Sequence, residues 1–383
     1  MYEALKELEK VSSLRERELI EARSGGVPLI EYFGRFIPEA LIRACGAGVY
    51  PLAGGGELAP PDAAKDEMLG CMNPLARSIA GGIKLGTDRM AGKADIVVTA
   101  VTDIHIGRLS ELLEFWGVNV CKVGVPSDWR NEIAFEYYLN SIRRMLETVS
   151  RLSGKAMDLE LARKYVGEMN RANAAFRHIK ELRRRSNPPV SFENYMRLQH
   201  LSFRLCNTAV AAEAVESIGL ELDGADGVYP KGAPRLMLAG RAVAPGDYEL
   251  LRLLDESGAA VVTELLDDYV RVSDADIELD GDLVENFARS RYLDTIPIDS
   301  FQPSWDKRLE RILSLCEEYG CDGVVWYQLA YDEVYDMEYV CLAKSLAERG
   351  IPLLRLETNY SYTPESIALA RKQIANFVGG LRR

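Results

Sequence analysis

Two segments of the chain place an aspartate just beyond a run of apolar residues. The run ADIVVTAVT (94–102) is followed by Asp103, and DGVVWYQL (322–329) is followed closely by Tyr331-Asp332. Continuous β-branched runs are typical of buried parallel strands, and open α/β sheets bind ligands beyond the carboxyl ends of their strands. An aspartate at such a position can also cap the next helix, and composition alone favours that role. Either way, we expect the two aspartates to lie close together.

The seven cysteines are scattered and form no C-x-x-C pair, which excludes a local zinc ribbon or ferredoxin loop. Four lie inside helical patterns and are expected to be small buried side chains: Cys45, Cys206, Cys316 and Cys341. Cys71 differs because it stands at a loop-to-helix junction, in MLGCMNPLARSIAGG. A helix N-terminus stabilises a thiolate, so Cys71 is a candidate metal or cluster ligand.

A glycine-rich run, Gly54-Gly55-Gly56-Glu57, matches a dinucleotide-binding pattern in part. Pro60-Pro61 follows and delays the helix that such a site requires, so we expect no NAD. The chain also has no G-x-x-x-x-G-K-[ST] motif, so we expect no P-loop nucleotide. The glycines allow backbone amides to approach a ligand closely. Two roles are open for Glu57. It could donate or accept a proton beside a carbonyl, or it could be a solvated carboxylate on the surface.

The elements that position these residues follow a clear order. Short apolar runs alternate with helical patterns before and after a long stretch in which helical periodicity dominates. This alternation favours parallel sheets covered by helices. We therefore predict the α/β class, with two Rossmann-like parallel-sheet lobes and a helical insertion. The expected parts are an N-terminal helix (1–26), a first α/β lobe (27–130), a helical subdomain (131–223), a linker (224–234) and a second α/β lobe (235–383). The shared strand, Asp and helix pattern indicates a weak internal repeat.

Composition excludes several classes of protein. The chain has 383 residues, with 46 Lys and Arg against 58 Asp and Glu, for a formal net charge of −12. This balance argues against nucleic-acid binding and against binding to an anionic membrane. There is no apolar run of membrane-spanning length and no secretory h-region, and the scattered cysteines fit a reducing compartment. We expect a cytoplasmic protein. The basic run RHIKELRRR (177–185) is expected to be a solvated helix face, or alternatively a contact to a partner or a coenzyme phosphate.

The ordered set of these segments resembles the 2-hydroxyacyl-CoA dehydratase / benzoyl-CoA reductase subunit family. The resemblance begins with YFGRFIPEALIRACGAGVYPLAGGGE (32–57) and continues through the Cys71 segment, both Asp segments and the helical middle. It implies two α/β lobes, a homo- or heterodimer with a paralogous subunit, and an ATP-dependent iron–sulfur activator. It also implies an acyl-CoA substrate whose thioester carbonyl accepts a low-potential electron, giving a ketyl radical that expels a hydroxyl group or dearomatises a ring.

The resemblance further implies a [4Fe-4S] cluster held by three cysteines. Cys71, with Arg77 six residues later, matches the first of them. The other two are expected in Cys-Asp pairs, where this chain has Thr102-Asp103 and Tyr331-Asp332. Oxygen ligands suit such a cluster poorly. We therefore expect that this chain has lost the ordinary cluster, which would then lie in the paralogous partner.

The resemblance also implies a set of site residues. The candidate catalytic residues are Glu57, Asp103, Tyr331 and Asp332. The candidate substrate-binding residues are Arg35, Glu39, Gly54, Gly55 and Gly56, and Cys71 is a candidate cluster ligand. Three functions remain open: an acyl-CoA dehydratase or reductase subunit, a cluster-free partner that serves assembly or electron-donor docking, and a solitary member with a repurposed cleft.

Overall fold

Eight strands form two four-stranded parallel sheets in the computed structural model, which describes residues 2–87, 90, 92–128, 131–267, 272–295 and 305–381. The first sheet has the order β2-β1-β3-β4 and the second β6-β5-β7-β8. The strands of the first sheet are β1 (Leu29–Phe33), β2 (Gly48–Pro51), β3 (Ile96–Val101) and β4 (Val120–Gly124). Those of the second are β5 (Arg235–Gly240), β6 (Ala260–Leu266), β7 (Gly323–Leu329) and β8 (Leu353–Thr358). The predicted fold class is confirmed.

The two lobes repeat one strand order, and the repeat extends to single hydrogen bonds. In the first lobe, Asp95 Oδ2 accepts from Leu29 N at 2.8 Å, and Asp95 N donates to Leu29 O at 2.8 Å. In the second lobe, Asp322 and Arg235 exchange the same two bonds, each at 2.7 Å. An aspartate therefore fixes the start of the central strand pair in each lobe. The internal repeat that the sequence indicated is a repeat of structure.

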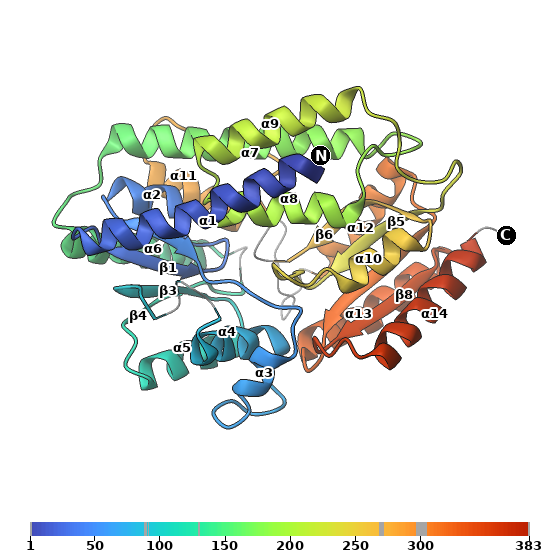
Figure 1. Cartoon of the computed structure of the whole chain (residues 1–383), viewed down its shortest axis with the longest axis horizontal. Helices are drawn as coiled ribbons and strands as arrows, with labels where there is room; N and C mark the ends of the chain where they lie inside the picture. The colour runs from blue at the N-terminus through green and yellow to red at the C-terminus, as the bar shows by residue number, and fades with distance from the viewer. Residues whose placement is uncertain are drawn as a thin grey trace.

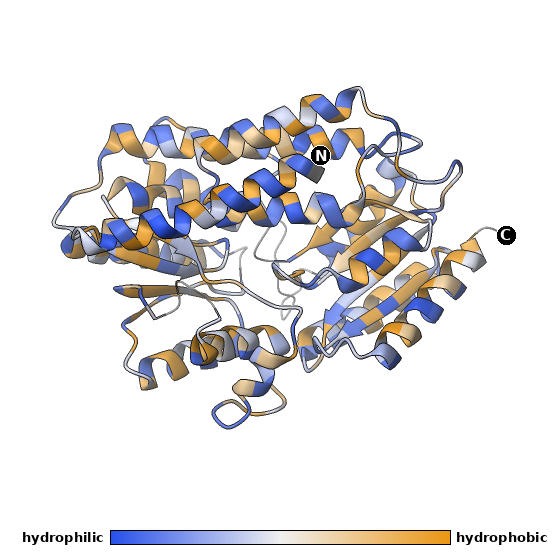
Figure 2. Cartoon of the chain, viewed as in Figure 1, coloured by the Kyte–Doolittle hydropathy of each residue, from blue (hydrophilic) through white to orange (hydrophobic). Residues whose placement is uncertain are grey.

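Helices cover both sheets. The first lobe has α2 (Glu39–Ala44), α3 (Ala59–Ala63), α4 (Pro74–Leu85) and α5 (Ile104–Phe115). The second has α10 (Glu249–Glu256), α12 (Trp305–Tyr319), α13 (Glu333–Ala347) and α14 (Pro364–Leu381). α11 (Leu283–Ala288) and a short π-helix (Arg289–Leu293) follow β6 in the sequence but pack against α6 (Glu132–Ser153). In Figure 2 the strands of both sheets are largely hydrophobic, which is the pattern of parallel strands buried on both faces. The sequence analysis did not predict α11 or the π-helix.

The longer helices outside the two lobes are α1 (Tyr2–Ser24), α6 (Glu132–Ser153), α7 (Leu159–Leu182), α8 (Phe192–Arg204) and α9 (Ala209–Asp223). Figure 1 shows α1, α7, α8 and α9 lying together along one side of the molecule. Helix α8 packs against β2 of the first lobe and against β6 and α10 of the second. One apolar core accordingly runs from Leu5 in α1 to Val378 in α14. Whether 131–223 is a separate domain stays a prediction.

None of the helices in the described part of the chain has the length and apolarity needed to cross a membrane.

Candidate functional site between the two lobes

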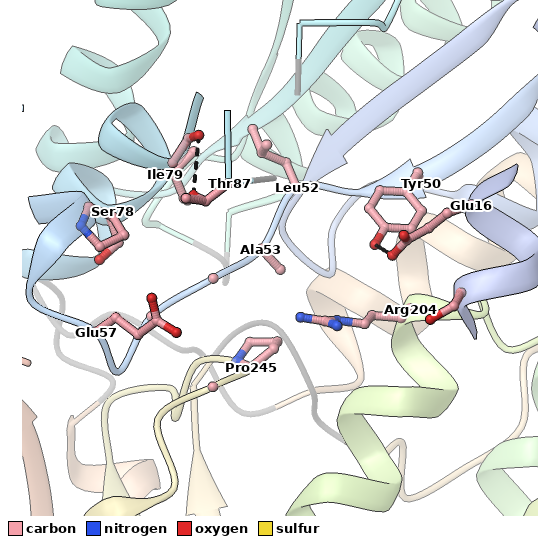
Figure 3. Close-up of a pocket in the computed structure, with 16 residues that line it drawn as sticks. Glu16, Tyr50, Leu52, Ala53, Glu57, Ser78, Ile79, Thr87, Arg204 and Pro245 are labelled. Carbon is pink, nitrogen blue, oxygen red and sulfur yellow. Dashed lines mark hydrogen bonds between the residues drawn. The ribbon is translucent and has the colours of Figure 1, made fainter. Parts of the chain in front are cut away.

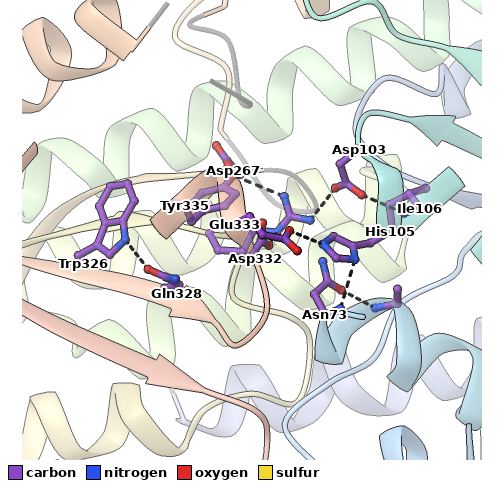
Figure 4. Close-up of polar contacts among 12 residues, drawn as sticks. Asn73, Asp103, His105, Ile106, Asp267, Trp326, Gln328, Asp332, Glu333 and Tyr335 are labelled. Carbon is purple, nitrogen blue, oxygen red and sulfur yellow. Dashed lines mark hydrogen bonds and ion pairs between the residues drawn. The ribbon is translucent and has the colours of Figure 1, made fainter. Parts of the chain in front are cut away.

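A buried arginine connects carboxylates from both lobes. Arg241 follows β5, and its Nη2 lies 2.8 Å from Asp103 Oδ2 of the first lobe. Its Nε lies 3.3 Å from Asp332 Oδ2 of the second lobe, an ion pair that lacks hydrogen-bond geometry. We call this group the Arg241 triad, and Figure 4 shows its two aspartates, Asp103 and Asp332, with the contacts around them. The predicted closeness of the two aspartates is confirmed, because one guanidinium contacts both.

The pKa values of the two aspartates of this triad shift in opposite directions. Burial raises the pKa of Asp103, but the charge of Arg241 and a hydrogen bond from Ile106 N outweigh burial and lower the pKa overall. Burial raises the pKa of Asp332, and the neighbouring charge of Asp103 adds to that effect. Asp103 also caps α5 through the bond from Ile106 N, at 2.9 Å, whereas the Asp332 side chain makes no capping bond to the described residues of α13. The capping role is therefore confirmed for Asp103 alone.

Cys71 and Tyr331 line one cavity of about 640 Å³ at the same edge. The Cys71 side chain is exposed, and Tyr331 has a left-handed backbone with φ of 64°. A non-glycine residue there costs of order 1 kcal/mol and persists where the surroundings impose it, often at functional sites. The structure thus brings Cys71, Tyr331 and the two aspartates to one region between the lobes. We call the cavity the Cys71 cavity.

His105 connects the loop of Cys71 to the second lobe. Its Nδ1 accepts a hydrogen bond from Asn73 N at 3.3 Å, and its Nε2 lies 3.6 Å from Glu333 Oε2 (Figure 4). Asn73 caps α4, because its Oδ1 accepts from Ala76 N at 2.9 Å. Glu333 lines the Cys71 cavity. No local pattern in the sequence marks Asn73 or Glu333, because their partner His105 is distant along the chain.

The residues at this edge do not fit a three-thiolate [4Fe-4S] cluster. Cys71 is the one thiol among the three matching positions; the other two are Thr102 and Tyr331. The aspartates that follow them are bound by a cationic guanidinium, which competes with any metal for their oxygens. Within the described ranges, no group of three or more His, Cys, Asp or Glu side chains could hold a metal ion.

Arg35 and Glu39 lie elsewhere, in a small buried cavity of about 40 Å³. Asn207 Nδ2 donates to Glu39 Oε1 at 3.2 Å, and Arg35 Nη2 lies 3.5 Å from Thr295 Oγ1. Burial raises the pKa of Glu39. This cavity shares no lining residue with the Cys71 cavity or with the glycine loop. The structure therefore does not unite these two residues with Gly54–Gly56, and their substrate-binding role stays a prediction.

The glycine loop contacts the other lobe at close range. Gly55 N donates to Pro245 O at 3.2 Å, and a Cβ added to Gly56 would lie 2.4 Å from Gly246 O. Gly56 also has a φ of +81°, which favours glycine. Gly55 and Gly56 therefore serve at least in part to let the two lobes approach each other, and the substrate-binding role of Gly54, Gly55 and Gly56 stays a prediction. A Cβ added to Gly54 would meet no atom of the described residues within 4 Å.

Glu57 lines a third cavity, of about 380 Å³, which we call the Glu57 cavity. Figure 3 shows its carboxylate pointing into this space. The Glu57 cavity shares no lining residue with the Cys71 cavity. Glu57 thus lies apart from Cys71, and its role in proton transfer stays a prediction.

A buried acidic group near this loop was not predicted from the sequence. Asp247 accepts hydrogen bonds from the hydroxyls of Tyr327 and Tyr362. Burial raises the pKa of Asp247 to about 6. These partners come from β7 and from the segment after β8, so no local motif marks the group.

Two smaller sequence predictions need correction. Cys45, Cys206 and Cys316 are buried as expected, but Cys341 is exposed because it lies on the outer face of α13. In the basic run, Arg183 is not solvated. It is 1% exposed and pairs with Glu264 of β6.

Comparison with known proteins gives two kinds of match. The protein named "Putative dehydratase subunit YjiM" of Escherichia coli (strain K12) is 22% identical over 347 residues, which cover 90% of this chain and 89% of that protein. A metal-free mutant of a periplasmic metal-binding protein from Candidatus Liberibacter asiaticus is 11% identical; the match covers 92% of this chain and 99% of that one, with a TM-score of 0.22. The Mn-bound form of the same mutant has a TM-score of 0.23. Scores this low carry no structural argument.

The family comparison is more extensive. Residues 35–379 match the family described as 2-hydroxyglutaryl-CoA dehydratase, D-component. The matched range contains β2 to β8, the Arg241 triad and every lining residue of the Cys71 cavity. Because the match spans most of the sequence, the chain belongs to the 2-hydroxyglutaryl-CoA dehydratase D-component family.

Proposed function

We propose that the chain is one subunit of a complex of the 2-hydroxyacyl-CoA dehydratase type, acting on an acyl-CoA thioester together with a paralogous subunit. Family membership over residues 35–379 supports the dehydratase class. The observation that carries the proposal is the meeting of Cys71 and Tyr331 in one cavity between the lobes. Its volume of about 640 Å³ lies in the range of small-molecule sites.

The residues present in this chain suggest which subunit holds the cluster and which orients the substrate. The donor set beside Cys71 does not fit a [4Fe-4S] cluster, so we assign the cluster to the paralogous subunit. Low-potential electrons from an ATP-dependent iron–sulfur activator would then enter through that subunit. The role proposed for this chain is to orient the thioester and to exclude water from a reactive ketyl radical.

A second candidate is a cluster-free subunit without a catalytic role, which serves assembly or docking of the electron donor. The Arg241 triad favours this alternative, because a guanidinium occupies both aspartates at the edge where chemistry is expected. The two candidates differ in whether the Cys71 cavity contacts substrate.

The test is anaerobic co-expression of the chain with a paralogue that carries both Cys-Asp pairs. We expect one complex on size exclusion and, with the activator and ATP, loss of water from a 2-hydroxyacyl-CoA. The variant Tyr331→Ala should then lower turnover at least tenfold without changing assembly. The matched control is Tyr137→Ala, because Tyr137 is equally exposed but lies on α6.

Three results decide between the candidates. Loss of turnover in Tyr331→Ala alone supports the catalytic subunit. Equal turnover of both variants supports the non-catalytic subunit. Failure of the two chains to form a complex refutes both.

A further inference from the structure

The Glu57 cavity contains an arginine to which the described part of the chain offers no partner. Arg204 is the last residue of α8, is half-buried and lines this cavity. It makes no hydrogen bond or ion pair with any residue in the described ranges. By contrast Arg197, two turns earlier on the same face of α8, is bound to Glu193 at 2.8 Å. A partly desolvated guanidinium without a partner is a suitable contact for an oxyanion.

A second polar group in the wall is also unsatisfied. Ser78 of α4 is 4% exposed, and its Oγ has no hydrogen-bond partner among the residues that the structure describes. A buried hydroxyl without a partner is unfavourable, because it has lost its hydrogen bonds to water. Ser78 lines the same cavity as Arg204. Because the Ser78 Oγ is itself fully buried, it is not placed to contact a ligand, and the site does not depend on it.

The charges of the cavity are arranged on opposite sides. In Figure 3, Arg204 points into the cavity from one side, while Glu57 points in from the other, where Ser78 also lies. Glu16 lines the cavity as well, and its carboxylate accepts a hydrogen bond from the Tyr50 hydroxyl at 2.7 Å. A purely anionic ligand would be repelled by the two carboxylates. A purely cationic ligand would leave Arg204 without a counter-charge.

We propose that the Glu57 cavity binds a small zwitterion, with its oxyanion on Arg204 and its ammonium group on Glu57. The cavity volume of about 380 Å³ admits a molecule of this kind. The glycine loop and the turn at 245–246 both line the cavity, so its wall comes from both lobes. Binding there would therefore depend on the two lobes being in contact. This site is separate from the Cys71 cavity and does not depend on the proposed dehydratase function.

The test is isothermal titration calorimetry on the full chain. The probes are glycine, β-alanine, 4-aminobutyrate and 6-aminohexanoate, which differ in the separation of their charges, and inorganic phosphate as an anion without an ammonium group. We expect one of the four amino acids to bind best, with Kd in the millimolar range or below. Phosphate should bind at least tenfold more weakly than that probe.

Variants of both ends of the site complete the test. Arg204→Gln should weaken binding of the best zwitterion at least tenfold, and Arg204→Lys should weaken it less. Glu57→Gln should weaken the zwitterion but not phosphate. Arg197→Gln is the matched control on α8 and should bind normally. Circular dichroism and the Tm without probe establish that each variant is folded.

The proposal is overturned if none of the four zwitterions binds to the wild-type chain. It is also overturned if folded Arg204→Gln binds as well as the wild type does. Binding of phosphate as tight as that of the best zwitterion would make the cavity an anion site and would equally overturn it.

Discussion

Replacing Arg241 by methionine should destabilise the protein more than the loss of any exposed arginine. The substitution replaces the aliphatic stem of the side chain but leaves Asp103 and Asp332, both less than 10% exposed, without their cation. Removing one member of a buried ion pair costs about 3–5 kcal/mol, because the remaining charge is uncompensated. We expect a loss of unfolding free energy of about this size for Arg241→Met.

The assay is urea unfolding at pH 7, followed by tryptophan fluorescence. Arg371→Met is the control, because Arg371 pairs with Glu256 on the exposed surface and should contribute about 1 kcal/mol or less. The triple variant Arg241→Met/Asp103→Asn/Asp332→Asn should recover most of the loss, since neither position 103 nor position 332 then carries a charge, and Asn still caps α5. A loss below about 1 kcal/mol in Arg241→Met would refute the reasoning.

The pH dependence of Arg241→Met provides a second check. Without the guanidinium, burial should raise the pKa of both aspartates above their values in the unfolded chain. A raised pKa contributes stability that is present at low pH and is lost as pH rises through the folded-state value. The difference from the wild type should therefore shrink as pH falls from 7 to 4. A difference that stays constant over this range would show that buried charge is not its cause.

Three further predictions concern other parts of the chain. Burial raises the pKa of Asp247 to about 6, so its contribution to stability is present below pH 4 and is lost as pH rises through 6. The unfolding free energy of Asp247→Asn relative to wild type should therefore rise by about 2 kcal/mol from pH 4 to 7.5. A difference that does not change with pH would contradict this. Gly56→Ala should lower the Tm by several degrees, because its Cβ would clash with Gly246 O, whereas Gly54→Ala should change it little; equal Tm values would contradict the close contact. The anaerobically reconstituted chain alone should hold far fewer than four irons by metal analysis, since its described residues offer no cluster-binding group, and four irons lost on Cys71→Ser would disprove this.

The positions of the strands, and the clustering of polar residues beyond their carboxyl ends, could be predicted because both depend on short stretches of sequence. The β-branched runs of β3 and β7 indicate buried parallel strands, and the residues after them must meet at one end of a sheet. This is why Asp103 and Asp332 were expected to approach each other. The same logic placed Cys71 with Tyr331, since both lie next to the ends of such elements.

The partner of these aspartates could not be predicted from local patterns, because Arg241 lies 138 residues from Asp103. One signal was available: Gly34-Arg35 follows β1, and Gly240-Arg241 stands in the equivalent position at the end of β5. Yet the two arginines have different partners, which depend on how the lobes face each other. Arg183 illustrates the same limit. Its periodic basic run predicts a solvated face, but packing of α7 on the second lobe buries this one side chain against Glu264.

The repeated strand order has a consequence for how the chain folds during synthesis. Each sheet is built from one uninterrupted stretch, residues 29–124 for the first and 235–358 for the second. All strands of the first sheet can therefore pair before any strand of the second has left the ribosome. Helix α8, whose contacts include β2 on one side and β6 on the other, then emerges between them. Asp103 of the first lobe has no cation until Arg241 of the second lobe has been synthesised and the lobes have docked. Formation of the Arg241 triad is therefore a late step in folding.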